Sequence, residues 1–262
     1  MLPGAVAPGT PPAAGRPAGG ILPLAPGKKP RKHGGGGVGS AIGKPPGEEA
    51  IAGRPLYLNG TAGGMELARQ DKALHFKALT FAGEQLSKPG EACAVNIALV
   101  PPVVAKPAGQ PAGLLRYEVE LAACPLSFDI LEESLLVSSP NLICEFREAG
   151  CAVNPAGLWG PKAASFTPAK AKEIERARTR WEAAVRASFR EAAAAADKNA
   201  VKLIAREQAG FSSVREEQCR DYSGESTYGF CAARLTQARA FALKAKAGQV
   251  AEKGKAEKKK TR

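Results

Sequence analysis

The six cysteines are the residues of this chain whose type and spacing most clearly imply chemistry. They are Cys93, Cys124, Cys144, Cys151, Cys219 and Cys231. No two of them form a C-x-x-C pair, and the two histidines, His33 and His75, lie far apart in the sequence. A zinc site requires four ligands that usually come in close pairs, so the spacing argues against a metal centre. The even count predicts three disulfides and an oxidising compartment. The alternative is a cytosolic protein with six buried free thiols, because cysteine also packs as a small apolar residue.

The pairing of these cysteines is constrained best at the C-terminal end. Cys219 and Cys231 lie in two expected helical segments joined by a loop of Gly, Ser and Tyr residues. This arrangement is typical of a helical hairpin closed by a disulfide, which stabilises the fold by about 3 kcal/mol in the loop-entropy model. For the other four cysteines we expect Cys144–Cys151 and Cys93–Cys124, although six cysteines allow many other connectivities.

The segments around the first four cysteines indicate β-structure. Leu115–Leu121 alternates apolar and charged residues, which is typical of a half-buried antiparallel strand. Cys93–Leu99 alternates in the same way, and so do shorter stretches at 74–78 and 126–130. The phase of the alternation directs Cys93, and Cys144 in a further short strand, toward the interior. Asn59-Gly60 predicts a tight turn, and the prolines between 101 and 111 predict a long loop. We therefore expect a small antiparallel β module at 54–160, a sandwich or barrel-like unit of short strands.

The segments around the last two cysteines indicate helices. Thr167-Pro168 is an N-cap followed by proline in the first turn. The Ala- and Arg-rich sequence that follows favours helix up to about residue 196, with Trp181 and Val185 on its apolar stripe. Two further helices are expected before and after the Gly, Ser and Tyr loop. The predicted fold class is therefore α+β, with the β module followed by a disulfide-closed helical module at 161–245.

The two ends of the chain carry most of its positive charge. Residues 1–54 hold seven Lys and Arg against two Glu, and residues 240–262 hold eight against two, in a chain of net charge +12. We expect 1–53 to be a disordered Ala, Pro and Gly spacer and 246–262 a disordered basic tail. Such tails suit an anionic surface. Nucleic acid is a less suitable partner, because no aromatic residue is interleaved with either basic run.

The stretch from about 176 to 243 resembles the lysozyme-inhibitor LprI-type domain of bacterial envelope proteins. The resemblance rests on Cys219, on Cys231 and on a set of motif residues around them. Those motif residues are Phe211, Arg215, Glu216, Leu235, Thr236 and Arg239. Phe211 stands where tryptophan is usual, and Val214-Arg215-Glu216 replaces a Tyr-Arg-Asp sequence. The resemblance implies a periplasmic or secreted protein that binds a macromolecule, with inhibition of lysozyme as its specific activity.

The function expected from these observations is binding without catalysis. The sequence contains no nucleophile elbow, phosphate loop or His-Glu-x-x-His motif, so we expect no enzyme, no cofactor and no small-molecule substrate. A cationic lysozyme would require acidic contacts, for which the β module offers Glu118, Glu120, Glu132 and Glu133. The alternative is a structural or adaptor protein that its basic tails tether to an anionic envelope surface. The first residues lack the apolar run of a secretion signal, so we expect the signal to precede the given chain. A cytoplasmic location is the alternative.

Overall fold

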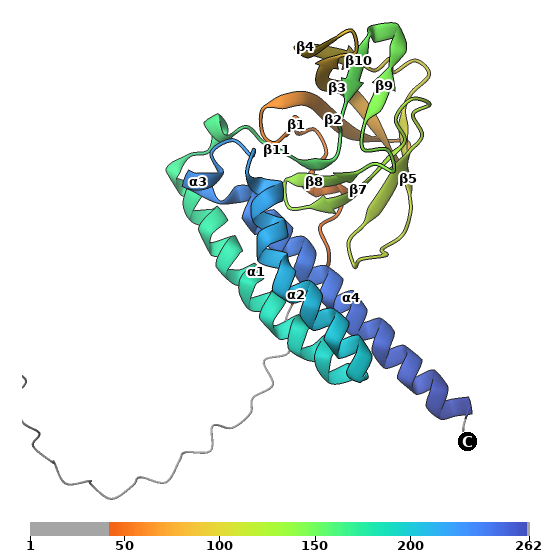
Figure 1. Cartoon of the computed structure of the whole chain (residues 1–262), viewed down its shortest axis with the longest axis vertical. Helices are drawn as coiled ribbons and strands as arrows, with labels where there is room; N and C mark the ends of the chain where they lie inside the picture. The colour runs from red at the N-terminus through yellow and green to blue at the C-terminus, as the bar shows by residue number, and fades with distance from the viewer. Residues whose placement is uncertain (1–41, 261–262) are drawn as a thin grey trace, which may run out of the picture. The chain divides into compact units, whose positions relative to one another are not determined.

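The computed structural model describes residues 42–260, in which β-strands are followed by α-helices (Figure 1). The strands are β1 (Leu56–Leu58), β2 (Ala62–Gln70), β3 (Ala73–Gln85), β4 (Lys88–Asn96), β5 (Val104–Pro107), β6 (Arg116–Val119), β7 (Leu126–Leu131), β8 (Ser134–Ser138), β9 (Cys144–Phe146), β10 (Cys151–Val153) and β11 (Gly157–Gly160). The helices are α1 (Pro168–Ala195), α2 (Lys198–Cys219), α3 (Glu225–Tyr228) and α4 (Phe230–Lys260). These described residues belong to one compact unit.

Eight of the described strands close into an antiparallel barrel. Their order is β2, β1, β11, β8, β7, β6, β5 and β3, and β3 pairs back with β2 to complete the circle. The remaining strands, β4, β9 and β10, extend the sheet beyond the barrel. The expectation of a small β module is therefore wrong: the fold is a closed barrel with extra strands, followed by helices. Closure satisfies the backbone hydrogen bonds that the edge strands of an open sheet leave unpaired.

Strand β3 connects the barrel to its extension because it is long enough to serve both. Its 13 residues pair with β2 and β5 in the first half, and with β4 and β10 in the second half. Gly83 lies where the second half meets β10, and a Cβ there would lie 2.1 Å from the carbonyl oxygen of Ala152. Only glycine permits this close approach of the two backbones.

The tight turns follow the residue types that favour positive φ. Asn59 and Gly60 have φ of 53° and 71° between β1 and β2, which confirms the predicted Asn-Gly turn. Asp71 and Lys72 form a second two-residue turn between β2 and β3, again with positive φ. The proline-rich segment predicted as a long loop contains β5, which pairs with β3 and β6 and is part of the barrel wall.

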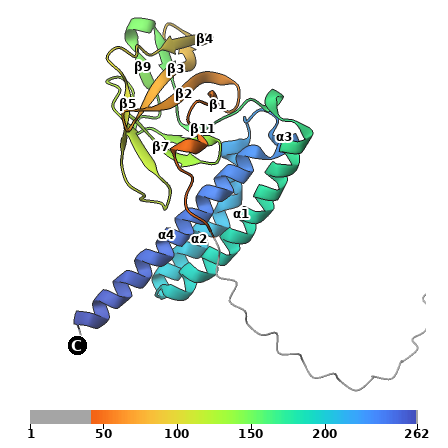
Figure 2. The ribbon, with the colours of Figure 1, turned by 180° about the vertical axis from the view of Figure 1, so that it is seen from behind.

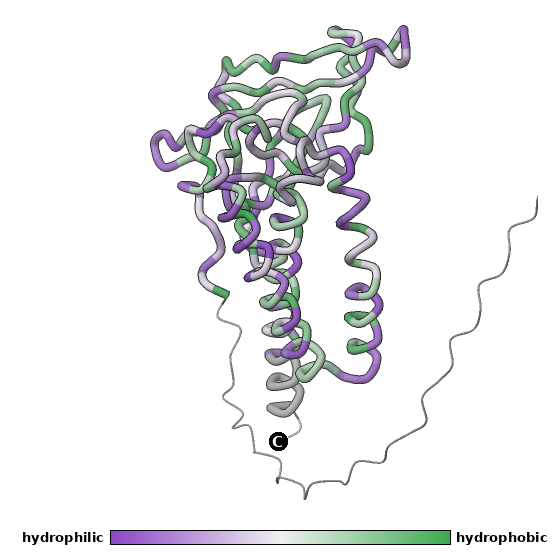
Figure 3. The backbone as a smooth tube through the Cα atoms, turned by 90° about the vertical axis from the view of Figure 1, so that its left-hand side faces the viewer, coloured by the Kyte–Doolittle hydropathy of each residue, from purple (hydrophilic) through white to green (hydrophobic). Residues whose placement is uncertain are grey.

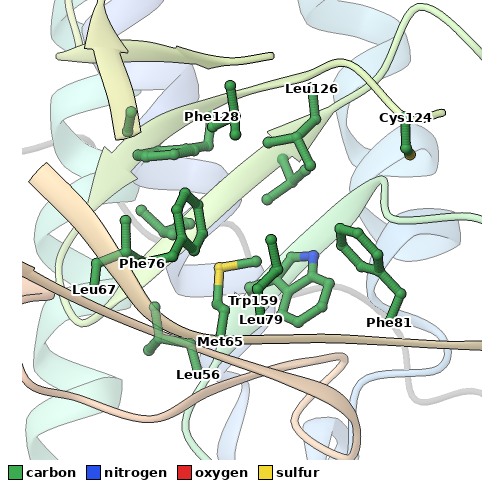
Figure 4. Packing of buried hydrophobic residues seen from close by; sticks show 14 of the residues in the cluster. Leu56, Met65, Leu67, Phe76, Leu79, Phe81, Cys124, Leu126, Phe128 and Trp159 are labelled. Atoms are coloured by element: carbon green, nitrogen blue, oxygen red, sulfur yellow. The ribbon is translucent and has the colours of Figure 1, made fainter. Parts of the chain in front are cut away.

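The interior of the barrel is filled by apolar side chains. Figure 4 shows Met65, Phe76 and Trp159, from three different strands, meeting inside the barrel. All three are buried, and Phe128 contacts Phe76 edge-on with the ring centroids 6.4 Å apart. A filled interior leaves the outside of the barrel and its junction with the helices as the surfaces available to a partner.

The helices begin at the residues that the sequence indicates. The Thr167 side chain accepts a hydrogen bond from the Lys170 backbone N–H and caps α1, as predicted. Asp197 separates α1 from α2 and caps α2 through the N–H groups of Asn199 and Ala200. Helix α1 packs chiefly against α4 (Figure 2), and the ring of Trp181 in α1 contacts that of Phe241 in α4. Figure 3 shows hydrophobic and hydrophilic residues alternating along these helices, which is typical of helices with one face on a core.

Both expected disordered ends are corrected where the structure describes them. Residues 1–41 of the predicted spacer lie outside the described residues. From Ile42 onward the chain is packed: Ile42 and Ile51 are buried, and the Ile42 carbonyl accepts a hydrogen bond from Lys244. The predicted basic tail is helical, because α4 continues to Lys260.

Candidate functional site

The three disulfides lie within the modules rather than between them. Cys219–Cys231 closes the helical hairpin as predicted. The other two bridges are Cys93–Cys151 and Cys124–Cys144, so the predicted pairs Cys144–Cys151 and Cys93–Cys124 are wrong. In the β9–β10 hairpin Cys151 lies opposite Phe146 and Cys144 lies opposite Val153, so the two cysteines do not face each other.

Cys93 and Cys151 instead flank the same strand. Cys93 of β4 lies opposite Gly83 of β3, and Cys151 of β10 lies opposite Gln85 of β3. Their bridge therefore passes over β3. Cys144 is buried and Cys93 packs against the barrel core, which confirms the inward direction predicted from the alternation. All six cysteines are paired, which indicates an oxidising compartment.

The predicted motif residues come together between α2 and α4. Arg215 donates a hydrogen bond to the Thr236 hydroxyl at 3.0 Å, and Arg239 donates to Gln208 and Glu207. Phe211 lies between the two arginines, with the guanidinium carbons 5.4 Å and 5.9 Å from its ring centroid.

Leu235 is buried beside these contacts, whereas Glu216 is exposed. Most of the motif residues thus hold two helices together. Glu216 is the member whose side chain lies open to a partner.

The four predicted partner-binding glutamates are split between two places. Glu118 and Glu120 are exposed on β6 and just after it, and Lys106 pairs with Glu120 at 2.7 Å. Glu132 and Glu133 form the two-residue turn between β7 and β8, and this turn faces the helices. The structure therefore does not bring the four carboxylates into one acidic surface.

Glu132 and Glu133 are the centre of an ion-pair cluster that joins the barrel to the helices. Glu132 pairs with Arg234 of α4 at 2.6 Å and with Arg180 of α1 at 2.9 Å. Its backbone N–H also donates to the side chain of Gln237 in α4. Glu133 pairs with Lys170 at 2.5 Å, and more weakly with Arg54 and Arg234. Four cations therefore surround two carboxylates at this junction.

The surroundings shift the pKa of two groups in this cluster, Glu133 and Arg234. Burial acts to raise the pKa of Glu133, but the hydrogen bond from Lys170 and the charges of Arg234 and Arg54 outweigh it and lower that pKa. Arg234 is only 2% exposed, and its guanidinium also stacks on the ring of Phe230 at 4.8 Å. Burial lowers the pKa of Arg234, while Glu132 and Glu133 oppose that effect.

A cleft of about 540 Å³ lies beside this cluster, which we call the junction cleft. Its lining includes Arg54, Lys162 and Lys170 as cations and Glu133 as the carboxylate. Tyr57 of β1 and Phe166, just before α1, supply aromatic walls. The Lys162 ammonium lies 4.3 Å from the centroid of the Tyr57 ring, which is a cation–π contact. A cleft with this lining suits the binding of an anion.

Sequence patterns missed the cations of this site because they come from separate segments. Arg54 precedes the first strand, Lys162 follows the last one, and Lys170 lies in the first turn of α1. The one available signal is the Glu132-Glu133 pair between two apolar runs, which is typical of a short hairpin turn. That signal indicates the turn and leaves its partners undefined.

Comparisons with models of known protein families, with curated proteins and with solved structures find no match to this chain. Within residues 42–260, no group of three or more His, Cys, Asp or Glu side chains has an arrangement suited to a metal ion. None of the helices described between 42 and 260 has the length and hydrophobicity that a membrane span requires.

Proposed function

We propose that this chain is a noncatalytic protein of the bacterial envelope, periplasmic or secreted, that binds an anionic macromolecular surface and acts there as an adaptor. The observation that carries the proposal is the basic end of α4. Lys253, Lys255 and Lys258 to Lys260 lie on the last turns of this helix, with Glu252 and Glu257 among them. Figures 1 and 2 both show these turns extending past the connection between α1 and α2.

The helical backbone concentrates the charge of these lysines. At a rise of about 1.5 Å per residue, five lysines between 253 and 260 fall within about 11 Å along the helix axis. That length is close to the screening distance of about 8 Å at physiological ionic strength. The five lysine charges therefore add in their attraction to an anionic surface. Each lysine near an anionic bilayer contributes about 1 kcal/mol to binding. A lipid or lipopolysaccharide surface is therefore the partner that this helix suits.

The test compares two variants of the full chain with equal net charge. In the first, all five lysines between 253 and 260 are replaced by Gln. In the second, five exposed cations of α1 and the start of α2 are replaced by Gln. These are Lys172, Arg176, Arg186, Arg190 and Lys198.

Co-sedimentation with phosphatidylglycerol vesicles measures the affinity of each protein. We expect the first variant to lose at least about tenfold in affinity and the second to change little. Wild-type binding should fall steeply with added salt. Equal losses of affinity in both variants would mean that net charge alone governs binding. The proposal that the end of α4 binds the surface would then be wrong.

Inhibition of lysozyme is the second candidate, favoured by the motif residues that pack around Cys219–Cys231. Glu118, Glu120 and Glu216 are the exposed acidic residues in the predicted sets, while Glu132 and Glu133 are already paired with cations. A turbidity assay of cell-wall lysis with equimolar protein tests this candidate. Unchanged lysis by several lysozyme types would leave only the binding of another macromolecule.

A further inference from the structure

We propose that the junction cleft binds a small amphiphilic anion, with a carboxylate, sulfonate or phosphate head on an apolar body. This proposal concerns a different site from the end of α4 and does not depend on the proposed function. The volume of the junction cleft, about 540 Å³, falls within the range of sites that hold small organic ligands, about 300–1,000 Å³. A macromolecular surface would not enter a cleft of this size, so the ligand is a small molecule.

The charge of the lining requires an anion. Three cations line the cleft against one carboxylate, and Glu133 already shares its charge among Lys170, Arg54 and Arg234. Lys162 forms no ion pair with any described residue, and its ammonium lies over the face of Tyr57. The Arg54 side chain is about half exposed and uses one nitrogen in its 3.3 Å contact with Glu133. Arg54 and Lys162 therefore have donors left for the head of a ligand.

The walls of the cleft require an apolar body. Tyr57 belongs to the barrel, in a strand that pairs with β11. Phe166 is held on the helical side by Tyr228 and Phe230, with ring centroids 5.2 Å and 5.3 Å away. The two aromatic residues therefore come from different modules and are each fixed by their own neighbours. Apolar surface of this kind stabilises a bound hydrocarbon or aromatic group in proportion to the area removed from water.

The experiment uses 8-anilinonaphthalene-1-sulfonate as the anionic probe and N-phenyl-1-naphthylamine as its neutral analogue. Fluorescence titration of the full chain gives the affinity for each probe. Arg54→Gln and Lys162→Gln remove one cleft cation each. Lys77→Gln is the matched control, because Lys77 is exposed on β3 and forms no ion pair with the described residues.

We expect each cleft variant to weaken sulfonate binding by about fivefold and the double variant by about twentyfold, while the control stays within about twofold. Affinity for the neutral probe should be the same in all variants. Equal sulfonate affinity in wild type and all four variants, or no binding at about 100 μM probe, would overturn the proposal.

Amide chemical-shift mapping of the full chain locates the bound probe. The shifts should concentrate at Tyr57, Lys162 and Lys170. The competing location is the exposed apolar pair Leu142 and Ile143, whose side chains are 83% and 62% exposed. Shifts concentrated at that pair would show that the probe binds an exposed apolar surface, and the assignment to the cleft would be wrong.

Discussion

The guanidinium of Arg234 in α4 lies 2.6 Å from the carboxylate of Glu132 in the β7–β8 turn, although 102 residues separate them in the chain. The two partners differ in their surroundings. Arg234 is almost completely buried, whereas Glu132 is about one-third exposed and has Arg180 as a second partner. Loss of Glu132 therefore leaves a buried charge without its closest partner, while loss of Arg234 leaves a carboxylate that is still paired.

The first prediction follows from this asymmetry. Glu132→Gln should lower the free energy of unfolding by about 3 kcal/mol, because it leaves the buried Arg234 charge with only its 3.8 Å contact to Glu133. Arg234→Met should cost clearly less, since a similar apolar side chain fills the space and Arg180 remains beside Glu132. Urea unfolding of the two variants measures the difference. If Arg234→Met is the more damaging change, the buried charge does not set the cost.

The second prediction concerns acid stability and rests on Glu133. The folded protein lowers the pKa of this carboxyl below the ordinary value of 4.5, so the unfolded chain takes up the proton first as pH falls. The stabilisation is fully present above about pH 4.5 and is lost as pH falls through the folded pKa.

Glu133→Gln should therefore be less stable than wild type at pH 7 but lose less stability between about pH 5 and pH 3. Thermal unfolding across this pH range measures both effects. Glu118→Gln is the control, because Glu118 is exposed and forms no ion pair with described residues. Parallel pH profiles for wild type and Glu133→Gln would contradict the prediction.

The third prediction concerns the pairing and the cost of each disulfide. Peptide mapping without reductant should recover Cys93 joined to Cys151 and Cys124 joined to Cys144. In the loop-entropy model, the 58-residue separation of the first pair stabilises the fold by about 4 kcal/mol, and the 12-residue separation of Cys219–Cys231 by about 3 kcal/mol. Unfolding of the corresponding double-alanine variants tests this order. Recovery of Cys144 joined to Cys151 would contradict the register of the β9–β10 hairpin.

The fourth prediction concerns Phe211, which lies between Arg215 and Arg239. Phe211→Trp should be tolerated and stabilise the protein slightly, because tryptophan has the most favourable ring for cation–π contacts. Phe211→Ala should destabilise it by about 1–2 kcal/mol through the loss of both contacts and of apolar burial. Chemical unfolding of the two variants provides the measurement. Equal stability of wild type and Phe211→Ala would show that the arginines do not depend on the ring.

The sequence predicted the elements whose signals are local. The alternation at 115–121 predicts β6, the Asn59-Gly60 pair predicts the turn between β1 and β2, and Thr167 predicts the start of α1. Strand β2 was missed because its Gly63-Gly64 start lacks strict alternation, and β5 was missed because prolines surround it.

Barrel closure depends on the pairing of β2 with both β1 and β3, and no single segment encodes that geometry. The candidate site was predictable to the same limited degree. Glu132 and Glu133 were singled out as acidic residues, but their partners come from the segment before β1 and from two helices. Only the folded topology brings these charges together. The sequence therefore indicates a partner-binding surface at Glu132 and Glu133, whereas in the structure these residues join the barrel to the helices.

The two disulfides of the β-strand region, one inside the loop closed by the other, determine how this chain would respond to mechanical force. Cys124–Cys144 lies inside the loop closed by Cys93–Cys151, whose cysteines are 58 residues apart. Force applied to the two ends of the chain would therefore pass through the Cys93–Cys151 bond. The residues inside that loop would not extend, which shortens the stretched chain by about 200 Å at roughly 3.5 Å per residue. No bridge joins the barrel to the helices, so the ion pairs and the apolar packing of Leu131 and Leu158 against the helices would carry the load at the junction. In a protein anchored at both ends, residues 93–151 would thus stay closed by their bridge while the barrel strands outside that loop and the junction with the helices remain free to separate.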